Sequence, residues 1–188
     1  MDPEMWPEVW LVRHGETEWS RDHRHTSTTD LELTTDGEAV ARELAARLEH
    51  SFDVVLTSPR RRARDTAALA GHPEAEVDAD LVEWDYGDYE GISTAEVRET
   101  VPGWTVWTHP TPGGEGADEV TERLDRVVTR LRGQPSALVF GHGHALRALA
   151  ARWVGLPVSE GRLLKLDTAT VSVLGFEREQ PVVLRWNC

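Results

Sequence analysis

The hydrophobic positions of this chain occur in short runs that alternate with longer segments in which apolar residues recur every three or four positions. Short runs rich in β-branched residues are typical of buried strands, and the three-to-four-residue period is typical of helices that cover a sheet. The expected strands are residues 9–13, 52–57, 76–81, 137–141, 170–176 and 182–186. The expected helices are residues 35–48, 59–69, 117–131 and 145–154.

Local signals mark several ends of these elements. Thr35 and Glu38 have the spacing of a capping box, and Pro59 stands where a helix can begin directly after a strand. The last two strands are close enough in sequence to form a hairpin. Residues 101–116 contain two tryptophans, three prolines and four glycines. This composition predicts an ordered excursion of the chain over one edge of the fold.

The alternation of strands with helices predicts the fold class. We expect an α/β three-layer sandwich, in which a mostly parallel central sheet has helices on both faces. The 188 residues suit one domain with a sizeable core, so we expect residues 1–188 to form a single domain. No repeat, linker or low-complexity segment interrupts the pattern.

The charge balance of the chain restricts its partners. It has 33 acidic and 20 basic residues, a net charge of −13, and every basic residue except Lys165 is an arginine. Binding to nucleic acid needs a basic face that neutralises phosphates, so we expect no nucleic-acid partner. An anionic substrate would need a local cluster of arginines.

Cysteine usage and hydropathy restrict the compartment. Cys188 is the single cysteine, which excludes an internal disulfide and a cysteine metal cluster. No apolar stretch is long enough to span a membrane, and Met1–Glu4 does not resemble the start of a signal peptide. We therefore expect a cytoplasmic protein that makes no membrane contact.

Two of the hydrophobic runs continue directly into a histidine beside a glycine. The first gives Arg13-His14-Gly15 and the second gives Gly141-His142-Gly143. Ligands of open α/β sheets bind just beyond the carboxyl ends of the strands. Two imidazoles at one edge of one sheet, the first with an arginine beside it, predict a reaction centre.

The first of these segments, residues 11–17 (Leu-Val-Arg-His-Gly-Glu-Thr), resembles the signature of the histidine phosphatase superfamily, the phosphoglycerate-mutase-like fold. Three further segments of that family return in the expected order. Residues 58–67 resemble its second-arginine segment, residues 81–91 its acid loop and residues 140–143 its second-histidine segment. The resemblance covers essentially the whole chain.

The resemblance implies a role for each of five residues. His14 would be the nucleophile, Glu83 the proton donor, and Arg13, Arg62 and His142 the groups that bind the phosphate. A transferred phosphoryl group carries its charge on three equatorial oxygens, so catalysis consists mainly of positioning and electrostatic stabilisation. Arginine suits bidentate contact with such oxygens, and a protonated or donating His142 would complete the clamp.

The branch of the family that the chain resembles implies a class of substrate. Several strings resemble the sedoheptulose-1,7-bisphosphatase branch and also broad-specificity phosphatases, which implies hydrolysis of a small phosphorylated metabolite such as a sugar (bis)phosphate. Three positions differ from the residues that are common in this family. Ser20 stands where asparagine is common, Ser27 stands where glycine is frequent, and Gly116 stands where serine or threonine is frequent. The resemblance implies substrate contacts at Ser20, Thr26, Ser27, Tyr86, Gly143 and Arg147.

The same residues are also compatible with other functions and other roles. A phosphomutase would depend on a bisphosphorylated primer, and a silent phospho-ligand-binding module would not need a general acid. Tyr86 could equally be an aromatic residue at the edge of the core, and Arg147 a residue of the helix surface. His142 and His144 with His23 and His25 could suggest a metal, but no carboxylate spacing supports one. We expect a phosphatase that needs no metal and no cofactor.

Overall fold

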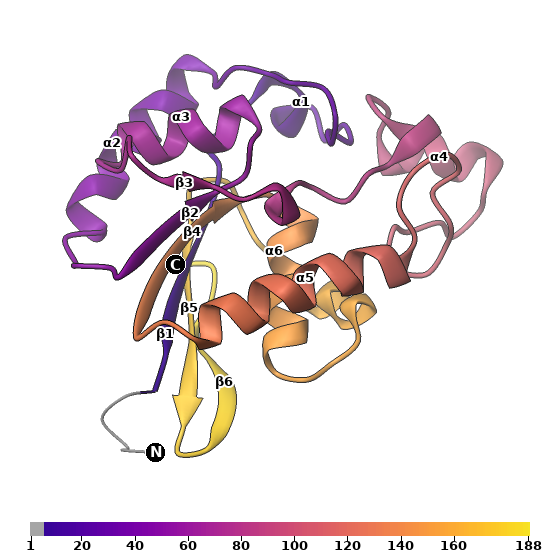
Figure 1. Cartoon of the computed structure of the whole chain (residues 1–188). Helices are drawn as coiled ribbons and strands as arrows, with labels where there is room; N and C mark the ends of the chain where they lie inside the picture. Colours follow the sequence, from indigo (N-terminus) through magenta and orange to yellow (C-terminus); the bar gives the residue numbers. More distant parts are fainter. Residues whose placement is uncertain (1–5) are drawn as a thin grey trace.

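The protein, described by a computed structural model over residues 6–188, is built around one six-stranded sheet (Figure 1). The strands are β1 (Glu8–Arg13), β2 (Val54–Thr57), β3 (Glu76–Val77), β4 (Ser136–Gly141), β5 (Val171–Glu177) and β6 (Gln180–Arg185). Their order is β3-β2-β4-β1-β5-β6. The first four strands in this order are parallel, whereas β5 and β6 form an antiparallel hairpin at one edge. The predicted mostly parallel sheet is confirmed.

Helices cover both faces of this sheet, as expected (Figure 1). They are α1 (Glu18–Arg21), α2 (Thr35–Arg47), α3 (Arg61–Leu69), α4 (Thr94–Thr100), α5 (Ala117–Arg132) and α6 (Gly143–Trp153). Three 3₁₀ segments add η1 (Ala79–Leu81), η2 (Gly87–Tyr89) and η3 (Val158–Leu163). Helices α2 and α3 pack on one face, and α5 and α6 pack on the other (Figure 1).

The two cores follow from the two-residue period of the central strands. Leu11 of β1 packs into the cluster that contains Leu124 of α5, whereas its neighbour Val12 packs into the cluster that contains Leu44 of α2. All four side chains are buried. Because β1 and β4 are apolar on both faces, they occupy the centre of the sheet, as parallel strands usually do.

Several predicted element ends are wrong by a few residues. The N-cap of α2 is Thr34, whose side chain accepts from the backbone N–H of Gly37, so the capping box at Thr35 and Glu38 does not form. Strand β3 ends at Val77, because Asp78 caps the 3₁₀ turn η1. Helix α3 begins at Arg61, two residues after Pro59.

Two helices and one exposed position were not predicted. Helices α1 and α4 begin with capping boxes at Thr17 and Ser93, but each is too short to show a hydrophobic period. Val40, expected on the buried stripe of α2, is 43% exposed, and Ala41 is buried in its place. The 101–116 excursion lies with α4 beyond one end of the sheet (Figure 1).

The strand register brings the two predicted site histidines together. Arg13 of β1 is paired with Gly141 of β4, and the backbone N–H of His14 donates to the carbonyl of Gly141 at 2.9 Å. His14 and His142 therefore leave neighbouring strands at the same edge of the sheet. Within residues 6–188, no helix combines the length and apolar composition that crossing a membrane requires.

Candidate active site

His14 is held in one tautomer. Its Nδ1 lies 2.7 Å from the carbonyl oxygen of Gly15, and a carbonyl only accepts, so Nδ1 carries the hydrogen and Nε2 keeps its lone pair. Burial, followed by the charges of Arg62 and Arg13, holds the pKa of His14 well below 6.5. The ring is therefore neutral at pH 7, which is the state that a nucleophilic imidazole requires.

Glycine at position 15 permits this arrangement. A Cβ there would lie 2.7 Å from the carbonyl oxygen of Gly37, at the start of α2. The N–H of Gly15 donates to Thr66 Oγ1 of α3 at 2.9 Å. The turn after β1 is thus packed closely between two helices of one layer, which fixes the backbone that holds His14.

Arg13, the residue before His14, has one buried donor without a hydrogen-bond partner among residues 6–188. Its Nη1 donates to the carbonyl of Leu166 at 2.6 Å, but its Nε is buried and has no hydrogen-bond partner among residues 6–188. A Cβ on Gly143 would lie 3.3 Å from the Arg13 guanidinium, so glycine leaves room for the arginine beside α6. Burial lowers the pKa of Arg13 below its usual value, yet an arginine of a protein stays charged.

Arg62 and His142 form a buried pair behind these groups. Arg62, in the first turn of α3, donates from Nε to His142 Nδ1 at 3.2 Å, and its Nη1 donates to the carbonyl of Thr29 at 2.9 Å. His142 Nε2 lies 2.7 Å from Ser58 Oγ, and the rings of His14 and His142 are 5.2 Å apart between centroids. Both nitrogens of His142 are therefore engaged with the protein.

His142 is neutral in this arrangement. Its Nδ1 accepts from a guanidinium, and burial, with Arg62 next, holds the pKa of His142 well below 6.5. Of the two states expected for His142, protonated or donating, this geometry favours the neutral, donating one, because an adjacent buried cation opposes a second positive charge. Arg61, the neighbour of Arg62, points to solvent and pairs with Glu32 and Asp65.

Glu83 reaches the site from the other side. It lies in the acid loop (residues 81–91), and its carboxylate meets the N-terminus of α6. Oε1 accepts from two backbone N–H groups, that of Trp84 at 2.9 Å and that of Ala145 at 2.7 Å. Oε2 accepts from the backbone N–H of His144 at 3.0 Å. Since each carboxylate oxygen has two acceptor positions, Oε1 is filled and Oε2 keeps one free.

One pocket joins these groups. Three of the five residues expected to bind or transfer the phosphate line it: Arg13, His14 and Glu83. The other two, Arg62 and His142, are fully buried and lie behind it. Of the six expected substrate contacts, five also line this pocket: Ser20, Thr26, Tyr86, Gly143 and Arg147.

Ser27 is the exception among the expected contacts. It is buried, and its Oγ donates to Glu90 Oε2 at 2.6 Å. Its backbone N–H also donates to the Glu90 carboxylate, and its carbonyl accepts from Arg62. The structure therefore places Ser27 among the supports of Arg62, where a serine replaces the usual glycine and binds a neighbouring acid.

The remaining pocket wall comes from residues that sequence patterns did not assign to substrate. His144 Nδ1 lies 2.5 Å from Tyr86 Oη, and the ring of His25 stacks on Tyr86 with centroids 4.7 Å apart. Burial holds the pKa of His144 well below 6.5 and raises that of Tyr86 well above 10.0, so both are neutral. The sequence feature that could have assigned His144 to the pocket is its position two residues after His142.

Arg147 lies at the edge of the pocket on α6. Its guanidinium packs 4.7 Å over the ring of Trp107, and its Nε donates to the carbonyl of Gly161 at 3.1 Å. The arginine is thus held in place and still lines the pocket. Within residues 6–188, no three histidine, cysteine or acidic side chains are grouped as metal ligands would be.

The chain belongs to the histidine phosphatase superfamily (branch 1), whose family model matches residues 9–188. It is 45% identical over 173 residues to an acid phosphatase of Mycobacterium tuberculosis, a match that covers 89% of this chain and 85% of the relative. It is 36% identical over 193 residues to sedoheptulose 1,7-bisphosphatase of Saccharomyces cerevisiae, covering 84% and 71%. The chain is therefore a histidine phosphatase, an enzyme that hydrolyses phosphate esters.

The fold agrees with solved structures of this family. The structure of the product of an open reading frame of Mycobacterium tuberculosis superposes with a TM-score of 0.89 and 42% sequence identity, covering 96% of both chains. The resemblance stated from the motifs is confirmed.

Proposed function

We propose that this phosphatase hydrolyses phosphomonoesters of small metabolites through a phosphohistidine formed on His14. His14 carries the proposal. Its ring is neutral, its Nδ1–H is bound to a carbonyl, and its Nε2 keeps a lone pair in a pocket where Arg13 has an unpaired Nε–H. An in-line nucleophile beside a fixed cation is what phosphoryl transfer needs.

In the first half-reaction, Nε2 of His14 attacks phosphorus and the bond from phosphorus to the ester oxygen breaks. The alkoxide that leaves takes a proton from Glu83. Because Oε1 of Glu83 already accepts two N–H groups, the proton is held on Oε2. Arg13 stabilises the charge on the transferred oxygens, and Arg62 supports His142 beside them.

In the second half-reaction, water attacks the phosphohistidine. Oε2 of Glu83 takes a proton from this water, the nitrogen–phosphorus bond breaks, and inorganic phosphate and neutral His14 are regenerated. The same carboxylate therefore serves first as acid and then as base. The His14 tautomer does not change in either step, because Nδ1–H stays bound to Gly15.

The substrate class follows from the arginine at the pocket edge. Arg147 lines the same pocket as Arg13 and His14, so a ligand whose phosphate lies at His14 can carry a second anion to Arg147. A relative 36% identical to this chain is a sedoheptulose 1,7-bisphosphatase, which supports the same class. We propose that sugar phosphates, bisphosphates above all, are the substrates.

Trapping the intermediate tests the covalent mechanism. The enzyme is mixed briefly with a phosphomonoester labelled in the phosphate, under single-turnover conditions, and denatured in alkali. We expect label that is stable to base and labile to acid, present in wild type and in the surface variant His50→Ala, and lost in His14→Ala. Hydrolysis that proceeds without any trapped label would mean direct attack by water and would overturn the proposal.

A further inference from the structure

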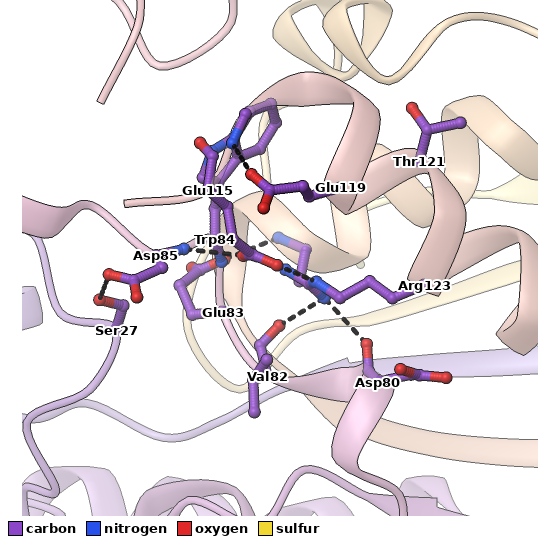
Figure 2. A network of polar contacts seen from close by, with 12 residues as sticks. Ser27, Asp80, Val82, Glu83, Trp84, Asp85, Glu115, Glu119, Thr121 and Arg123 are labelled. Atoms are coloured by element: carbon purple, nitrogen blue, oxygen red, sulfur yellow. Dashed lines mark hydrogen bonds and ion pairs between the residues drawn. The ribbon is translucent and has the colours of Figure 1, made fainter. Parts of the chain in front are cut away.

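The acid loop that carries Glu83 is attached to a buried ion pair that does not touch Glu83 (Figure 2). Arg123 of α5 donates from Nε and Nη2 to the two carboxylate oxygens of Glu115, at 2.7 and 2.9 Å. The side chain of Arg123 is 7% exposed and that of Glu115 is 20% exposed. This is a bidentate, largely buried ion pair, and neither residue lines the pocket that contains Arg13 and His14.

The pair holds the chain on both sides of Glu83. Arg123 Nη1 donates to the carbonyl of Val82 at 2.9 Å, and Glu115 Oε2 accepts from the backbone N–H of Asp85 at 2.9 Å (Figure 2). The residue before Glu83 and the residue two positions after it are thereby tied to the same guanidinium–carboxylate unit.

Backbone contacts remove the remaining freedom of the loop. The N–H of Glu115 donates to the carbonyl of Asp85 at 3.0 Å, and the indole N–H of Trp84 donates to the carbonyl of Glu115 at 2.9 Å. Gly114 lies so close to the loop that a Cβ there would be 2.2 Å from the Asp85 oxygen. The loop is therefore packed backbone against backbone on residues 111–115.

We propose that the Arg123–Glu115 pair positions the general acid: it fixes Val82 and Asp85 so that Oε2 of Glu83 faces the ester oxygen. The assignment rests on the proposed function, in which Glu83 is the proton donor. A buried ion pair contributes little net stability but imposes a precise geometry, and catalysis loses much of its rate when a group moves by about 1 Å. Arg123 and Glu115 are positioning residues and do not contact the substrate.

Two arginines of α5 provide a matched test. Arg123→Lys keeps the positive charge but cannot bridge the Glu115 carboxylate and the Val82 carbonyl together. Arg126→Lys is the control, because Arg126 lies one turn further along α5, is 61% exposed and pairs with the carboxylate of Asp80. Both arginines bond to residue 80, but only Arg123 reaches the acid loop.

The measurement is kcat/KM for two substrates that differ in their need for an acid. Glycerol 2-phosphate releases an alkoxide that must be protonated, whereas p-nitrophenyl phosphate releases a stable phenolate. We expect Arg123→Lys to lower kcat/KM for glycerol 2-phosphate roughly 10- to 100-fold, while p-nitrophenyl phosphate changes by less than about threefold. Arg126→Lys should change neither. Equal losses on both substrates, or no loss, would overturn the positioning role.

A double variant separates this inference from the proposed function. Glu83→Gln alone must lose activity selectively on glycerol 2-phosphate; if it does not, the general acid itself is misassigned. If it does, Glu83→Gln combined with Arg123→Lys should be no slower than Glu83→Gln, because the pair acts only through the acid. Multiplying losses would contradict the inference alone. If Arg123→Lys does not fold by circular dichroism, Glu115→Gln, which keeps the side-chain shape, undergoes the same comparison.

Discussion

The two halves of the site are built in different ways. The phosphate half (Arg13, His14, Arg62 and His142) comes from the ends of neighbouring parallel strands and from the first turn of α3. The proton half comes from the acid loop, whose residue Glu83 is oriented by the N-terminus of α6 and whose flanks are held by residues 111–115 and by α5. The first half depends on the sheet, and the second depends on contacts between loops and helices.

This difference implies a separation of tasks. In the proposed mechanism, His14 and Arg13 meet the transferred group and Arg62 and His142 support them from behind, so the phosphate half acts on every phosphomonoester regardless of the leaving group. The proton half acts only where the leaving oxygen needs a proton. Variants of the two halves should therefore differ in their dependence on the leaving group, and not only in the size of their effects.

The largest effect is expected in the phosphate half. Arg13→Ala removes a donor that stabilises transition-state charge, and Arg62→Ala removes the buried cation that supports His142. Each should lower kcat/KM by on the order of 100-fold or more on any substrate. Arg61→Ala is the matched control, because Arg61 lies beside Arg62 but pairs with Glu32 and Asp65 at the surface. Steady-state kinetics of the three variants check this. Damage at Arg61 equal to that at Arg62 would contradict the assignment.

A smaller effect is expected at the edge of the pocket. Arg147→Ala should raise KM for a sugar bisphosphate roughly 10- to 100-fold, as expected when a charged hydrogen bond is lost. It should leave p-nitrophenyl phosphate nearly unchanged, because that ligand has no second anion. Arg152, one turn and a half later on α6 and paired with Asp125, provides the control variant Arg152→Ala. A wild-type enzyme with no preference for bisphosphates would rule out this substrate class.

The smallest effect concerns pH. Burial, the largest cause in each case, holds the pKa values of His14, His142 and His144 well below 6.5 in the folded protein. The unfolded chain binds protons on these rings below pH 6.5 and the folded chain does not, so the free energy of unfolding falls as pH decreases below 6.5 towards the folded pKa values. Each ring contributes at most about 1.4 kcal/mol per pH unit.

Urea unfolding at about pH 7.5 and about pH 5.5 measures this dependence. His144→Gln should reduce the loss of stability on acidification, whereas His50→Gln, at an exposed histidine, should leave it unchanged. An identical pH dependence in all three proteins would mean that His144 takes up a proton equally in the folded and unfolded chains.

The same contrast explains what the sequence could predict. The phosphate half follows a local rule, because an apolar strand that ends in a histidine delivers that histidine to the edge of a parallel sheet. The central strands and the long helices α5 and α6 were predicted for a similar reason, since their hydrophobic periods extend over many residues.

The rest depends on contacts that leave no local pattern. The stacking of His25 on Tyr86 joins segments about 60 positions apart. The short helix α4, whose Thr94 hydroxyl lies 3.1 Å from His25 Nε2, has no hydrophobic period. The hydrogen bond from Ser27 to Glu90 likewise joins residues that are far apart in the sequence. The support of the acid loop by Arg123 could not be predicted either, because a single arginine in a helix is usually solvated.

The division of the site into two halves is tested most directly by one ratio, kcat/KM for glycerol 2-phosphate divided by kcat/KM for p-nitrophenyl phosphate. It is measured in wild type, Arg13→Ala and Glu83→Gln. We expect Arg13→Ala to keep the wild-type ratio despite its low activity, and Glu83→Gln to lower the ratio by roughly 10²- to 10⁴-fold, the contribution of a general acid. A wild-type ratio in Glu83→Gln, with both substrates slowed alike, would contradict the account.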